Sequence, residues 1–99
     1  MNVDIQTVHF DADVKLKSHI ERKLEKLAHF HDRITKVEVY LKLDNIVHSI
    51  KDKIVEIKVA IPRHEFFVKR SCKSFEESFD DAMNALVMQI KRKKERMAA

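Results

Sequence analysis

The sequence contains no glycine among its 99 residues, and this absence argues against many nucleotide-binding sites. Phosphate-cradling loops, the G-x-G-x-x-G turn of dinucleotide-binding folds, the nucleophile elbow of hydrolases and the clamp loop of KH domains all require glycine. Their backbones adopt conformations or close approaches that a Cβ atom would block. The calcium loop of EF-hands needs a glycine as well. Most nucleotide-driven enzymes are therefore disfavoured.

Cysteine and apolar runs are scarce too. The one cysteine, Cys72, can form neither an internal disulfide nor a cysteine-based zinc site, and we expect it to be a small buried side chain at the end of a strand. No apolar run approaches the roughly 18 residues of a membrane span, and the amino-terminal residues lack the basic-then-apolar pattern of a signal peptide. These features predict a cytoplasmic protein without membrane association.

Histidines and acidic residues show no pattern typical of catalysis. The six histidines include no Glu-x-x-His or His-x-x-x-His spacing, so we expect no metal site and no cofactor. The acidic pairs Glu76-Glu77 and Asp80-Asp81 lie near the start of an expected helix, where the helix dipole favours negative charge. The sequence thus favours a protein that is not an enzyme.

The positive charge is concentrated in one place. The chain has room for a single domain, residues 1–99, and carries 20 Lys and Arg against 16 Asp and Glu, a net charge of +4. Residues 91–96, here called the basic segment, hold five cations and one acid, so the remainder of the chain is neutral. A neutral body with one basic end is suited to a polyanion, either a nucleic acid or an anionic membrane surface.

Hydrophobic periodicity predicts four strands and two helices in the order βαβββα. Each strand alternates apolar and polar residues, so one face of the sheet should be covered by both helices and the other should face water. This is an α+β two-layer sandwich. The expected strands are 3–8, 34–43, 55–61 and 66–72, with a polar connection over 44–52. The expected helices run from a cap at Asp11 or Asp13 to about Phe30, and from the capping box at Ser74 onwards.

Charges on the first helix are separated around its axis. The apolar positions Leu16, Ile20, Leu24 and Leu27 form one stripe, Glu21 and Glu25 fall on one flank, and Lys23 lies at the edge of the stripe. The opposite flank is basic. It comprises Lys15, His19, Arg22, Lys26 and His29. Ordinary i,i+4 pairing would interleave the signs, so this separation favours an anion-binding flank.

The last helix loses its apolar stripe after Ile90, where the basic segment begins. Lys91 and Lys94 fall on one flank and Arg92 and Arg96 on the other. We expect these turns to project beyond the core, to pack on nothing and to form one continuous positive patch with the basic flank of the first helix. Phosphate groups would relieve the repulsion between neighbouring cations.

Aromatic residues favour recognition of RNA shape and phosphate over stacking on bases. Only Tyr40 is expected to face outward, whereas Phe10, Phe30, Phe75 and Phe79 are assigned to the core. A platform for unpaired bases needs several exposed rings.

Short segments along the chain resemble the ribosome hibernation-promoting factor and ribosome-associated inhibitor family. They are Lys26-Leu27, Asp32-Arg33-Ile34, Val37-x-Val39-x-Leu41-Lys42, His48 and Val55-Glu56-Ile57. The resemblance covers essentially the whole chain and implies a fold like that of double-stranded-RNA-binding domains. It also implies a short-form member that binds the small ribosomal subunit over the mRNA and tRNA sites and silences idle ribosomes.

The resemblance also implies which residues face rRNA. In the first helix the family's basic positions fall on Arg22, Lys23 and Lys26, and in the last helix its Arg-Gln-Leu-x-Lys-x-Lys pattern falls on residues 88–94, with Met88 in place of the first arginine. The full set of expected rRNA-binding residues combines these positions with the charge patterns. It is Lys15, Arg22, Lys23, Lys26, Arg33, Lys42, Lys91, Arg92, Lys93 and Lys94.

Three classes of function are compatible with the sequence. The first is a ribosome-binding inhibitor, monomeric when free, that binds no small-molecule substrate. The second is a general RNA-binding or RNA-chaperone module without a fixed ribosomal site. The third, a small RNA hydrolase, requires His, Asp or Glu residues clustered in a cleft, and the sequence offers no such cluster.

Overall fold

A computed structural model describes residues 2–8, 10–43 and 53–98. Its elements follow the predicted βαβββα order, with one additional 3₁₀ helix after the first α-helix. They are β1 (Asn2–Val8), α1 (Val14–Leu24), η1 (Glu25–His29), β2 (Lys36–Leu43), β3 (Lys53–Ile61), β4 (His64–Cys72) and α2 (Phe75–Ala98). The connection expected over 44–52, and with it His48, lies outside the described residues.

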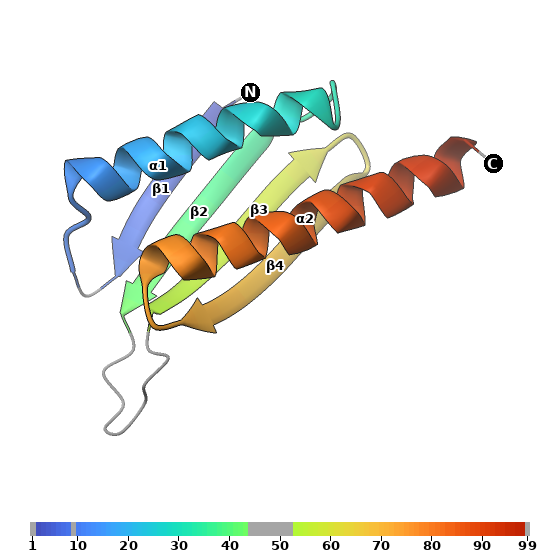
Figure 1. Ribbon diagram of the computed structural model, residues 1–99. Helices are drawn as coiled ribbons and strands as arrows, with labels where there is room; N and C mark the ends of the chain where they lie inside the picture. Colours follow the sequence, from blue (N-terminus) through green and yellow to red (C-terminus); the bar gives the residue numbers. More distant parts are fainter. Residues whose placement is uncertain (1, 9, 44–52, 99) are drawn as a thin grey trace.

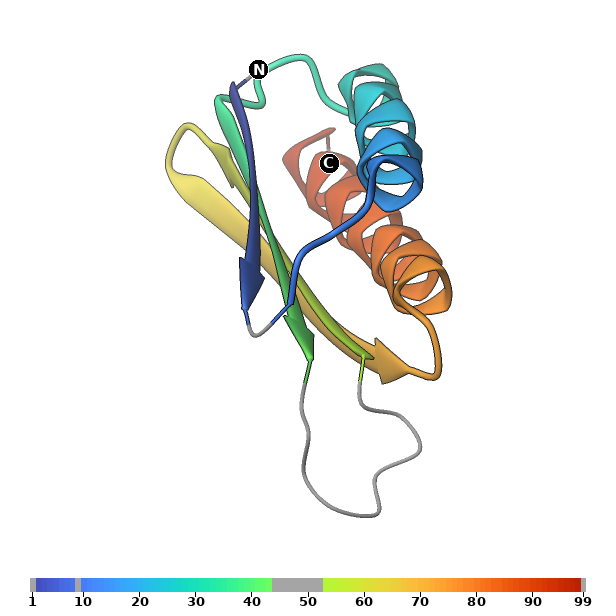
Figure 2. The same ribbon diagram turned by 90° about the vertical axis from the view of Figure 1, so that its left-hand side faces the viewer.

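The strands form one mixed sheet in the order β1-β2-β3-β4. β1 runs parallel to β2, as a crossover through α1 requires, and β3 and β4 follow as antiparallel neighbours. Both helices cover the same face of the sheet (Figures 1 and 2). The predicted α+β two-layer architecture is therefore confirmed, while the likeness to double-stranded-RNA-binding domains stays a prediction.

The core lies between the helices and the covered face of the sheet. Leu16, Ile20 and Leu24 of α1 and Leu27 of η1 form the expected apolar stripe and are all buried. Phe79, Leu86 and Ile90 of α2 are fully buried against this stripe and the sheet. The alternating residues of β2 and β3 complete the core. They are Val37, Val39, Leu41, Val55, Ile57, Val59 and Ile61. Period-two and period-3.6 patterns thus identify the buried faces correctly.

Local side-chain hydrogen bonds set where the helices begin. The Asp13 side chain accepts a hydrogen bond from the Leu16 amide at 2.8 Å, and Ser74 Oγ accepts one from the Glu77 amide at 3.1 Å. These caps satisfy backbone donors that have no partner within the helix. Ser78 is buried, and its hydroxyl donates to the Lys53 carbonyl oxygen at 2.6 Å, which ties the first turn of α2 to β3.

Several expectations about individual residues need correction. The first helix does not continue as an α-helix to Phe30, because its last turn tightens into η1. Phe67 is 48% exposed on the uncovered face of the sheet, so Tyr40 is not the only outward aromatic. Cys72 is half-buried at the last position of β4. The β3–β4 hairpin turns at Pro62-Arg63, with Arg63 at a φ of 67°, so β4 begins at His64, two residues before the expected start at 66.

Candidate nucleic-acid interface

The two helices run in the same direction, so their carboxyl ends lie at one end of the molecule (Figures 1 and 2). The last turn of α1 carries Arg22 and Lys23, and η1 adds Lys26. The basic segment of α2 lies at this same end, and the final turns of the helix extend past the tip of the β3–β4 hairpin (Figure 1). Parallel helices therefore bring together cations that are far apart in the sequence.

A groove of about 430 Å³ separates α1 and η1 from α2. Lys23 and Lys26 line one side, Met83 and Met88 line the other, and Phe30 also borders it. The apolar stripe of α1 faces the sheet, so the flank that contains residues 19, 23 and 26 is turned towards α2. Met88, which stands where the resembled family has arginine, is 54% exposed and contributes an apolar wall.

Asp80 bridges the two helices at the amino-terminal part of this groove. Its Oδ1 accepts hydrogen bonds from Lys23 Nζ at 2.8 Å and from His19 Nε2 at 2.9 Å. Partial burial raises the pKa of the Asp80 carboxyl, but the bonds from Lys23 and His19 outweigh it and hold the pKa below its ordinary value. Lys23 is thus engaged within the protein, which weakens its expected role as a free phosphate ligand.

Phe30 is the point where η1 meets the basic segment. Lys94 Nζ donates a hydrogen bond to the Phe30 carbonyl oxygen at 2.9 Å, and Lys91 Nζ lies 5.3 Å from the centre of the Phe30 ring. A cation over an aromatic face and a cation on a helix-terminal carbonyl are both favourable. We call Phe30 together with Lys26, Lys91 and Lys94 the Phe30 junction.

The Phe30 junction corrects the expectation that the basic segment packs on nothing. One flank of the segment, Lys91 and Lys94, contacts η1 as described. The other flank, Arg92, Lys93 and Arg96, lines a hollow of about 240 Å³ with His64 and Phe66 of β4. Lys91 and Lys94 thus lie on one side of the helix and Arg92 and Arg96 on the other, as expected, whereas Lys93, expected along the line of the apolar stripe, borders the hollow with Arg92 and Arg96.

The remaining expected site residues fall into two groups. Lys15 and Arg22 are exposed on α1, and Arg33 is exposed in the connection that follows Phe30. Among the described residues, no ion pair involves these three cations or any cation of the basic segment. Lys42 differs: it lies on the uncovered face of the sheet and pairs with Glu56 at 2.7 Å. The structure therefore places Lys42 on another face of the molecule. Lys15, the second residue of α1, lies at the end of that helix opposite to η1, so eight of the ten expected residues lie towards the Phe30 end.

Sequence reasoning missed Asp80 and the role of Phe30. The charge pattern indicates only a dipole-compensating role for Asp80. Phe30 packs against the core as expected, but it is half-buried, and its ring and carbonyl oxygen also contact Lys91 and Lys94. The contacts of these two residues span 61 and 64 positions of sequence, so no local pattern reveals them. Within the described ranges, no three His, Cys, Asp or Glu side chains gather as a metal ion requires.

The chain is similar to one protein family and to several solved structures. The family model described as Sigma 54 modulation protein / S30EA ribosomal protein matches residues 3–98. A ribosomal subunit interface protein from Coxiella burnetii has a similar structure, with a TM-score of 0.85 at 20% identity over 96% of this chain and 99% of that one. The N-terminal domain of Thermus thermophilus Protein Y has a TM-score of 0.79 at 24% identity over 93% and 98% of the two chains. No curated protein matches significantly.

Proposed function

The chain belongs to the Sigma 54 modulation protein / S30EA ribosomal protein family, and we propose that it is a non-enzymatic ribosome-binding inhibitor of translation. In this proposal it occupies the mRNA and tRNA channel of the small subunit and keeps idle ribosomes inactive. Its site of action is then the cytoplasm, and it is monomeric when free. The fold shared with a protein titled ribosomal subunit interface protein supports this assignment.

The observation that carries the proposal is the gathering of uncompensated cations at one end of the molecule. Lys91 and Lys94 contact Phe30, Lys26 borders the groove that Phe30 also lines, and Arg22 and Arg33 lie on the segments that lead into and out of η1. None of the five has a carboxylate partner among the described residues. Phosphate oxygens would supply the missing negative charge.

The chemistry required is binding alone. Each lysine or arginine that neutralises a phosphate releases condensed counterions, which drives association without a chemical step. Met83 and Met88 form apolar walls of the groove and contribute to the shape of the surface. Binding of this kind needs no exposed aromatic platform for stacking on bases. Inhibition then follows from occupancy, because a bound protein excludes mRNA and tRNA from the same channel.

Co-sedimentation through a sucrose gradient tests the proposal. We expect the protein to travel with isolated small subunits and to be displaced by mRNA together with initiator tRNA. Purified large subunits and bulk RNA serve as competitors in parallel gradients. Equal partition onto all RNAs, without displacement by mRNA and tRNA, would contradict the proposal and favour a general RNA-binding module.

A further inference from the structure

The edge of the sheet formed by β1 lies on the opposite flank of α1 from the basic groove. Within the described part of the chain, β1 pairs only with β2, so the outer backbone groups of β1 are free. The strand carries one charge, Asp4, and has neither the lysine nor the proline that commonly blocks such edges. It is therefore able to accept another strand.

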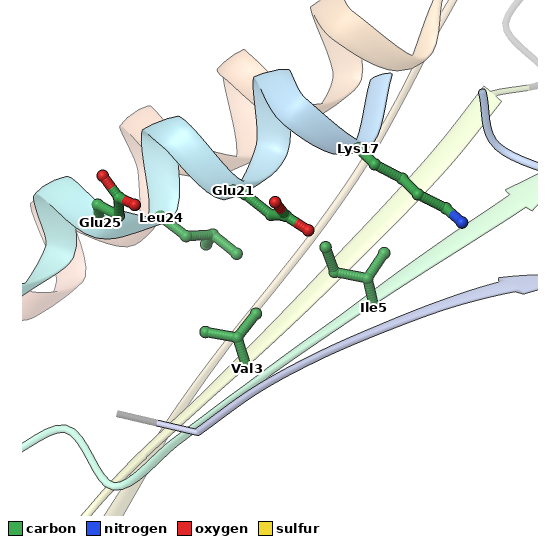
Figure 3. A pocket seen from close by; sticks show the side chains of 6 residues that line it. All are labelled: Val3, Ile5, Lys17, Glu21, Leu24 and Glu25. Carbon is green, nitrogen blue, oxygen red and sulfur yellow. The ribbon is translucent and has the colours of Figure 1, made fainter. Parts of the chain in front are cut away.

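A groove of about 440 Å³ runs beside this edge, under α1. Figure 3 shows Val3 and Ile5 rising from β1 towards the helix, with Leu24 on the helix side. Val3 is 38% exposed although it lies on the covered face of the sheet. The groove therefore has an apolar floor that the fold leaves partly open.

The rim of the groove is charged and predominantly acidic. Lys17 and Glu21 of α1 and Glu25, the first residue of η1, follow one another at one-turn intervals, and all three are exposed (Figure 3). Among the described residues, neither glutamate forms an ion pair. This edge is thus an acidic region on a protein whose net charge is +4, and it would repel RNA phosphates.

We infer that the β1 edge and its groove bind an extended basic segment of another protein, which adds as a strand beside β1. Lysine or arginine at alternate positions fits both parts of the site. The aliphatic stem covers Val3 and Ile5, and the charged end reaches the glutamates at the rim. Alternate residues of a strand are about 6.7 Å apart, close to the rise of about 6 Å between Glu21 and Glu25. Backbone hydrogen bonds to β1 supply the rest of the affinity.

This inference does not depend on the proposed function, because it concerns another flank and another class of partner. The probe is a short synthetic peptide of alternating lysine and threonine, titrated into isotope-labelled protein. We expect amide chemical shifts to move in β1 and along the Lys17–Glu25 side of α1. A glutamate–threonine peptide should not bind because it reverses the charge. A lysine–proline peptide should not bind because every second residue lacks an amide donor and its fixed φ disfavours the strand conformation.

Paired variants separate this site from general attraction to acidic residues. Glu21→Gln/Glu25→Gln should raise the dissociation constant for the lysine–threonine peptide at least about threefold, because exposed ion pairs are of modest strength. The matched control Glu76→Gln/Glu77→Gln removes the same charge from α2 and should leave this dissociation constant unchanged.

Three results would overturn the inference. The first is the absence of peptide binding. The second is equal binding by the two variants, or shifts confined to α2. The third is a concentration-dependent change at β1 without peptide, which would assign the edge to a second copy of this chain. The ribosome assay above can succeed or fail independently of all three.

Discussion

The uncovered face of the sheet and the end of the molecule at Phe30 both carry many cations, but the groups that contact these cations differ between the two regions. On the sheet face, lysines lie beside carboxylates. The nitrogen-to-oxygen distances are 3.3 Å for Lys36–Glu38, 2.7 Å for Lys42–Glu56 and 3.8 Å for Lys58–Glu65. At the Phe30 end, cations contact an aromatic ring and a backbone carbonyl oxygen instead. Ion pairing with carboxylates, and not the number of lysines, therefore determines where a positive potential remains on the surface.

The titration behaviour of the sheet face shows the same local compensation. The Tyr40 hydroxyl donates to the Glu38 carboxylate, and this bond is the main reason that the pKa of Glu38 is lowered; neighbouring Lys36 and Lys58 lower it further. The same bond raises the pKa of Tyr40. Among the described residues, Lys36, Lys42 and Lys58 on this face lie beside carboxylates and Lys69 forms no ion pair, so most of the positive charge is compensated locally and attracts a polyanion weakly.

The largest expected effect is the response of ribosome affinity to salt. If five to eight cations of the Phe30 end engage phosphates, affinity should fall on the order of 10²–10⁴-fold between 50 and 200 mM salt. Fluorescence titration of labelled protein with small subunits measures this dependence. A nearly flat response would show that contacts other than phosphate dominate.

The two flanks of the basic segment should differ in stability. Lys91→Ala/Lys94→Ala removes the contacts with Phe30 and should lower the free energy of unfolding by about 1 kcal/mol. For a domain of this size that corresponds to a fall in Tm of roughly 4–8 °C. Arg92→Ala/Arg96→Ala is the matched double variant and should move the Tm less. Calorimetry distinguishes the two, and equal Tm values would show that the Phe30 contacts add no stability.

Asp80→Asn should lower the free energy of unfolding by about 0.5–1 kcal/mol at neutral pH. The effect is modest because the Asp80 side chain is 41% exposed and water screens its bonds. The folded-state pKa of Asp80 lies below the ordinary 3.8, so its contribution is fully present above that pH. It is lost as the pH falls through the lower, folded-state pKa. Urea unfolding of both proteins from pH 7 to pH 2 should show the difference shrinking only below about 3.8. A difference that disappears already at pH 5 would assign it to another group.

The smallest effect is expected for Lys42→Ala on the sheet face. Its exposed pair with Glu56 is worth about 0–1 kcal/mol, and ribosome affinity should stay within about twofold of the parent. The same titration and urea experiments measure both quantities. A large loss of affinity without loss of stability would show that Lys42 belongs to the ribosome-binding interface.

Much of the fold follows from local patterns in the sequence. Alternation identifies the buried residues of β2 and β3, and the spacing from Leu16 to Leu27 identifies the buried stripe of the first helix. Ser74 and Asp13 mark the helix starts because their side-chain oxygens accept backbone hydrogen bonds nearby. The outward position of Lys42 also follows from its alternation with the buried Leu41.

The candidate site was less predictable because it depends on contacts between distant segments. Nothing around residue 30 indicates that the Phe30 carbonyl oxygen meets Lys94, and nothing around residue 80 indicates that Asp80 binds Lys23. The change from α-helix to η1 has no clear local signal either. Charge patterns find the cations, but the tertiary structure decides which of them remain without a carboxylate partner.

The most direct test of the central claim compares two triple variants, each lacking three cations. One is Lys91→Ala/Arg92→Ala/Lys94→Ala at the Phe30 end, and the other is Lys36→Ala/Lys42→Ala/Lys58→Ala on the sheet face. We expect the first to reduce the slope of log affinity against log salt by about two to three units, at roughly 0.7–0.9 per phosphate, and the second to change it by less than about one. Equal slopes for the two variants, with both proteins folded, would contradict the account.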